Sequence, residues 1–172
     1  DPPREIFVVH SLAETISSVA LNPDGSFGSV QADAQYLGAV PNHIIRLQNE
    51  LVITLSGQNE LLRLDESSLK VSGRINHGAG NNPMETVNLH PGAGTTSLAD
   101  GLLATSHLFT DQVRIDDANG RSWSSPPPWA RPVGQAPQAL LALPGSSASQ
   151  VRMLVANTAF STSNPAGSPY GD

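Results

Sequence analysis

The sequence contains no cysteine, few charged residues and no long apolar run. Without cysteine the chain has no disulfide, no thiolate metal ligand, no covalent haem attachment and no cysteine nucleophile. Charged residues make up only 14% of its 172 residues and the net charge is −6, so no nucleic-acid partner or anionic membrane surface is expected. No segment approaches the roughly 18 consecutive apolar residues of a membrane span, so none is predicted.

Turn-forming residues are abundant instead, with 15 glycines and 14 prolines between short clusters of Val, Leu and Ile. This composition predicts an all-β fold of many short strands. The expected strands are Ile6–Ser11, Thr15–Leu21, Gly28–Ala34, His43–Gln48, Leu51–Leu55, Glu60–Asp65, Leu69–Asn76, Met84–Leu89, Leu102–Ser106, Gln112–Asp116, Gln138–Leu143 and Met153–Thr158.

The segment Leu51–Pro83 is the clearest of several similar units. Gly-x-x-Pro turns begin at Gly38, Gly80 and Gly134, and the first strands of the units end near equivalent residues (His10, Leu55, Thr105 and Asn157). A period of roughly 40–50 residues with four short strands predicts a β-propeller of four-stranded antiparallel blades. The expected blades are approximately 5–50, 51–101 and 102–150, with the first strand of a fourth beginning at 151.

These residues resemble the YVTN-type β-propeller repeat family over roughly residues 5–158. MLVANT at 153–158 is close to the strand that opens each repeat of that family, and IFVVHSLAETISSV also resembles it. Leu55 and Thr105 depart from the pattern, because the family has Asn there. Since closed propellers need roughly four to eight blades, we expect this chain to be part of a larger ring of roughly seven. A continuation, a separate fragment or another subunit would supply the remaining blades.

The histidines and aspartates supply few candidates for a chemical site. No HxH, HExxH or HxxxH spacing occurs, so no metal, cofactor or catalytic residue is predicted. His77 and His90 flank a Gly/Asn/Pro-rich region where they could meet at one propeller face, although a role as ordinary loop histidines is favoured. Asp65 and Asp116 end equivalent strands, and we expect them to cap turns rather than to act as paired acids.

The segment 121–133 is the only one that the repeat does not explain. Its prolines favour polyproline II, and two tryptophans beside two arginines could form an exposed docking ridge. The alternative is an insertion that folds its tryptophans over a blade edge. The candidate binding residues here are Arg121, Trp123, Trp129 and Arg131. Residues 159–172 are expected to form a loop or a disordered tail.

Two functions are consistent with these patterns. The first is a non-enzymatic scaffold or interaction module of a secreted, periplasmic or cell-surface protein, which the resemblance to exported YVTN-type propellers implies. Its partner would be a protein that binds through face loops or the Pro/Trp insertion. The second is the propeller domain of a lactonase-like enzyme or a cytochrome-associated electron-transfer protein, with its active residues mostly outside this segment. The fold alone cannot distinguish the two.

Overall fold

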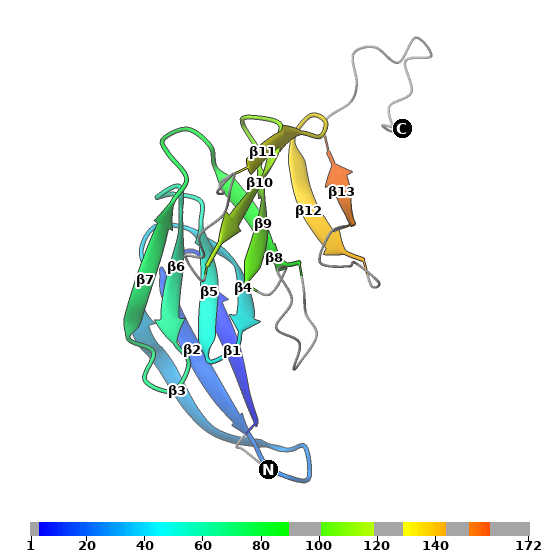
Figure 1. Ribbon diagram of the computed structural model, residues 1–172. Helices are drawn as coiled ribbons and strands as arrows, with labels where there is room; N and C mark the ends of the chain where they lie inside the picture. The colour runs from blue at the N-terminus through cyan, green and yellow to red at the C-terminus, as the bar shows by residue number, and fades with distance from the viewer. Residues whose placement is uncertain (1–3, 90–100, 119–128, 144–151, 159–172) are drawn as a thin grey trace. The chain divides into compact units, whose positions relative to one another are not determined.

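The computed structural model describes residues 4–89, 101–118, 129–143 and 152–158, and these form thirteen β-strands and no helix (Figure 1). The predicted all-β fold is therefore confirmed for the described residues. In this part of the chain there is also no helix long and apolar enough to cross a membrane. The predictions for Arg121, Trp123, His90 and the tail 159–172 concern residues outside the described ones.

The strands form four antiparallel sheets. The first contains β1 (Arg4–His10), β2 (Thr15–Leu21) and β3 (Phe27–Tyr36). The second contains β4 (Pro41–Leu47), β5 (Glu50–Leu55), β6 (Glu60–Asp65) and β7 (Val71–Asn76). The third contains β8 (Pro83–Asn88), β9 (Leu102–His107), β10 (Gln112–Asp117) and β11 (Trp129–Pro132). The last contains β12 (Pro137–Ala142) and β13 (Met153–Asn157).

The chain divides into two compact units, residues 1–76 and 77–172, and each has its own apolar core. In the first unit the two sheets pack against each other, with Phe7 and Val9 of β1 against a buried cluster centred on β5 and β6. That cluster consists of Ile16, Leu37, Leu51, Ile53, Leu55, Leu62, Leu64 and Leu69. Burial of so many aliphatic side chains is the main force that holds these two sheets together.

The second unit repeats this arrangement with fewer large side chains. Leu102 and Ala104 of β9 and Val113 of β10 share a core with Leu140 of β12, and Met153 and Val155 of β13 pack onto it. A partly buried polar contact adds to it, because the Leu140 backbone N–H donates to the Glu85 carboxylate of β8 at 2.9 Å. The pair of strands β12 and β13 thus covers one face of the sheet β8–β11.

Three hairpins have the same geometry at matching positions. His10 pairs with Thr15, Leu55 with Glu60 and His107 with Gln112. The fourth residue of each turn has a positive φ although none of the three is glycine (Glu14, Asn59 and Asp111).

Each predicted Gly-x-x-Pro turn has its glycine at positive φ, and its proline begins a strand (β4, β8 and β12). Proline is tolerated in that position because the first residue of a strand need not donate to the ladder.

The second and third sheets each begin one strand earlier than the corresponding unit predicted from the sequence. The strand near His43–Gln48 pairs with β5, and the strand near Met84–Leu89 pairs with β9, so each closes onto the strands that follow it. Pro83 lies opposite His107, just as Pro41 lies opposite Leu55, so His107 rather than Thr105 occupies the matching position. The segment 121–133 also includes a strand that was not predicted, since Trp129–Pro132 is β11. The arrangement of the sheets in a propeller ring stays a prediction.

Candidate functional site

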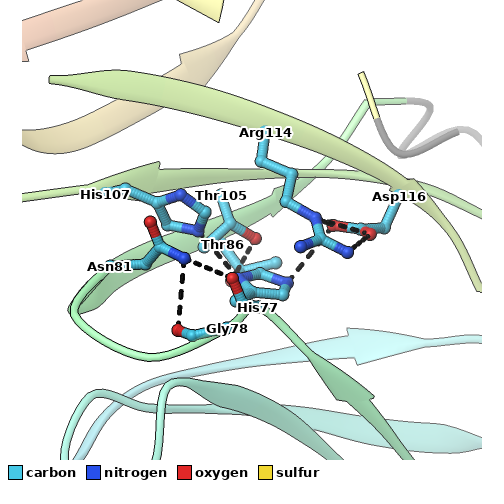
Figure 2. Close-up of polar contacts among 8 residues, drawn as sticks. All are labelled: His77, Gly78, Asn81, Thr86, Thr105, His107, Arg114 and Asp116. Atoms are coloured by element: carbon cyan, nitrogen blue, oxygen red, sulfur yellow. Dashed lines mark hydrogen bonds and ion pairs between the residues drawn. The ribbon is translucent and has the colours of Figure 1, made fainter. Parts of the chain in front are cut away.

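A buried cluster of polar side chains lies along one face of the third sheet (Figure 2). His107 ends β9, Arg114 and Asp116 belong to the neighbouring strand β10, and His77 comes from the turn that precedes β8. His77, His107 and Asp116 each expose 5% or less of their surface. Because buried polar groups cost free energy unless they are paired, the contacts among these side chains offset the cost of burying them.

His77 lies between the other two buried groups. Its Nδ1 is 2.8 Å from Nε2 of His107, and the two rings meet edge to face at a centroid distance of 4.8 Å. Its Nε2 lies 3.2 Å from Oδ2 of Asp116, close enough for electrostatic pairing although it is not aligned as a hydrogen bond. The three side chains therefore form a continuous row, Asp116–His77–His107.

Arg114 completes the cluster by holding the carboxylate of Asp116. Its Nε lies 2.9 and 3.1 Å from the two carboxylate oxygens, and its Nη2 donates to Oδ1 at 2.8 Å. Arg–carboxylate pairs of this kind are among the strongest ion pairs in proteins because their geometry is fixed by several charge-assisted hydrogen bonds. The guanidinium therefore orients the carboxylate that faces His77.

The turn that carries His77 is held by hydrogen bonds from a side chain of the same turn to its backbone. The Asn81 side-chain amide donates to the carbonyl of His77 and, at 3.1 Å, to that of Gly78. Gly78 and Gly80 both have positive φ, a conformation in which glycine is free of steric strain. Beside the histidines, the hydroxyls of Thr86 and Thr105 pair at 3.0 Å across β8 and β9.

The ring nitrogen that carries the proton in each histidine follows from the atom that faces it. An ionised carboxylate only accepts, so Asp116 favours a proton on the Nε2 of His77 that faces it. In a neutral ring the Nδ1 of His77 then accepts, and His107 donates from its Nε2. When both rings are neutral, His107 is thus the donor and His77 the acceptor of the hydrogen bond between them.

Burial and nearby charges shift two pKa values in this cluster. Desolvation, followed by the charges of His77 and Arg114, lowers the pKa of His107 from 6.5 to about 4, against a smaller opposing effect of Asp116. Burial acts to raise the pKa of Asp116, but the pairing with His77 and with Arg114 outweighs it and lowers that pKa overall. At neutral pH the cluster therefore contains a neutral His107 and an ionised Asp116.

The geometry of the cluster supports a structural role better than a chemical one. A carboxylate–histidine row can orient a proton, but a catalytic row must reach a substrate. A hollow of about 490 Å³ lies in the first unit and is lined by other residues, namely Glu5, Arg46, Gln48, Asn49, Asp65, Glu66 and Ser67. The described residues also contain no group of three or more His, Asp or Glu side chains that could hold a metal ion.

Of the six candidate binding residues, three lie in the described part of the chain. His77 is buried and meets His107, whereas the suggested partner His90 lies outside the described residues. Trp129 is half-buried and packs against the core of the second unit, and Arg131 is exposed on the same edge strand. Trp123 and Arg121 lie outside the described residues, so the proposed ridge stays a prediction.

The two aspartates that end matching strands have different roles. Asp65 caps a turn as predicted, because its carboxylate accepts from the Ser68 backbone N–H at 2.9 Å and from the hydroxyls of Ser67 and Ser68. The expectation of a turn cap was wrong for Asp116, which is buried and paired with Arg114 and His77. Arg114 provides the local signal, because it lies two residues before Asp116 on the same face of a strand.

No protein-family model and no curated protein sequence matches the chain. The resemblance to the YVTN-type repeat therefore stays a prediction, and the residues of the site are interpreted from their own geometry.

Proposed function

We propose that this protein is a non-enzymatic β-propeller scaffold or interaction module of an exported or cell-surface protein. The observation that carries the proposal is that its first and last sheets each present an apolar face to solvent. Ile6 and Val8 of β1 are 39% and 40% exposed, and Leu141 and Leu154 of the last sheet are 58% and 57% exposed. Contiguous exposed apolar surface of this kind is typical of surfaces that bind other proteins or further sheets.

The packing within each unit supports the same proposal. Antiparallel sheets that pack face to face through aliphatic cores are the construction of propeller blades, and the matching hairpins favour a repeated unit. Trp129 and Arg131 lie on the edge strand β11. An amphipathic ring and a charged group on such a strand are suited to contact a partner protein, which is consistent with a scaffold.

An enzyme or electron-transfer domain is the weaker alternative. The row Asp116–His77–His107 is the one arrangement among the described residues that resembles catalytic chemistry, and its three side chains are buried. Burial and the lowered pKa of His107 are both explained by a role in holding the third sheet together. The scaffold proposal therefore needs no additional assumption about this cluster.

The experiment that tests the proposal is protease accessibility on intact cells of the source organism. We expect an epitope-tagged copy of the protein to be cleaved by externally added proteinase K while a cytosolic reference protein stays intact. A tagged protein that is protected until the cells are lysed would contradict the exported location. The same sample with permeabilised envelopes is the control that the tag itself can be cleaved.

A further inference from the structure

The two faces of each sheet can be named in the same way from the strands β1, β5, β9 and β13, and these names show how the sheets pack. We name the faces by counting back from the residues that end β1, β5, β9 and β13, which are His10, Leu55, His107 and Asn157. Residues an odd number of positions before these form the forward face, and residues an even number before form the rear face. Side chains alternate along a strand, so each set lies on one side of its sheet.

Both cores pair a forward face with a rear face. In the first unit, Phe7 and Val9 of the forward face of β1 pack with Leu51 and Ile53 of the rear face of β5. In the second unit, Leu102 and Ala104 of the forward face of β9 share a core with Met153 and Val155 of the rear face of β13. The forward face of an earlier sheet is thus twice covered by the rear face of a later one.

Two faces of these same kinds remain exposed. The rear face of the first sheet carries Ile6 and Val8, and Val30 of β3 adds to it through its pairing with Val19, which lies opposite Ile6. The forward face of the last sheet carries Leu154, which lies directly opposite Leu141. The chain therefore presents the two complementary halves of the contact that it makes internally.

We propose that the forward face of β12–β13 of one copy packs onto the rear face of β1–β3 of a second copy. This inference rests on the proposed scaffold function and specifies its partner. A second copy is favoured because this chain itself supplies both faces, and because unlike faces give a head-to-tail contact. The net charges of the two segments also favour it. Residues 4–36 contain four acidic residues and one arginine, whereas residues 137–143 and 152–158 contain Arg152 and no acidic residue.

The test is sedimentation velocity of the full 172-residue chain over a range from low to high micromolar concentration. We expect the wild type to associate as concentration rises. Val8→Asp disrupts the rear face and Leu154→Asp the forward face, and each is expected to weaken association by about tenfold or more, because burying a charge in an apolar contact is unfavourable. Phe109→Asp is the matched control: Phe109 is 69% exposed in the β9–β10 turn, outside both faces, and its replacement leaves association unchanged.

Mixing the two variants distinguishes a head-to-tail contact from a symmetric one. The Val8→Asp copy keeps its forward face and the Leu154→Asp copy keeps its rear face, so an equimolar mixture is expected to form a heterodimer that neither variant forms alone. Circular dichroism checks that both are folded, and Ile6→Asp replaces Val8→Asp if that variant is not.

Two results would overturn the proposal: a wild type that stays monomeric at the highest concentration, or a mixture that associates no better than its components. Either would mean that another chain or further blades cover the faces. The scaffold function would be unaffected, because cell-surface proteolysis tests it separately.

Discussion

His107 contributes to stability in a way that depends on pH. Burial, with the charges of His77 and Arg114, lowers its pKa from 6.5 to about 4 in the folded protein. Between these values the unfolded chain holds a proton on this residue that the folded chain does not. The unfolded state is thus favoured as pH falls, and the contribution of His107 is complete above pH 6.5 and lost on the way down to about pH 4.

We predict that the free energy of unfolding falls by about 2 kcal/mol through this group between about pH 7.5 and pH 4.5. Urea unfolding at both pH values, followed by circular dichroism, measures the difference. In His107→Gln this part of the pH dependence disappears, although the variant is less stable at the higher pH because the contact with His77 is altered. His10→Gln is the matched control, because His10 lies at the corresponding hairpin position but contacts Ser17 rather than a second histidine. A His107→Gln variant with the same pH dependence as the wild type would contradict the assignment.

At the scale of single elements, the turn that enters β4 contains an unfavourable backbone conformation. Val40 has a φ of 54°, which is strained for a β-branched residue. The same position before β8 is occupied by Asn82 at a φ of 47°, and asparagine tolerates this region because of its short polar side chain. Val40 is also 42% exposed, so its side chain contributes little packing.

Val40→Asn is therefore expected to raise the free energy of unfolding by about 1 kcal/mol. The control is Val71→Asn, at a valine that is similarly exposed but lies in β7 with ordinary strand geometry. That change is expected to destabilise slightly, because valine suits a strand better than asparagine does. Equilibrium urea unfolding of the three proteins gives the comparison, and equal effects of the two substitutions would show that the strain at Val40 is relieved in solution.

The elements were predictable to the extent that local signals define them. Apolar clusters such as Leu51–Leu55, bounded by glycine, proline and asparagine, indicated most of the strands that the structure contains. Strand β11 was missed because Trp129–Pro132 follows three prolines and has no β-branched residue. The meeting of His77, His107 and Asp116 depends on how β8, β9 and β10 are registered, and such non-local pairing leaves no signal in the spacing of residues along the chain.

At the scale of the whole molecule, burial is distributed unevenly among the strands. Strands β5 and β9 each have a hydrogen-bonded neighbour on both sides, and nearly all of their residues are buried. Strand β3 is an edge strand, and all ten of its residues are exposed or half-exposed. Local opening requires little free energy where few apolar contacts are broken. Strand β3 should therefore open more readily than β5 and β9.

Hydrogen exchange of the native protein, measured by mass spectrometry, is therefore expected to be slower in β5 and β9 than in β3. The expected order follows from the number of contacts that each strand must break to expose its amides, since exchange proceeds through local or global opening. The measurement is made on the Val8→Asp and Leu154→Asp variants as well as on the wild type, so that any association is removed. Protection of β3 equal to that of β5 in these variants would mean that β3 is covered in solution by another part of the chain. If protection of β3 appears only in the wild type and rises with protein concentration, a second copy covers the first sheet, as the forward and rear faces predict.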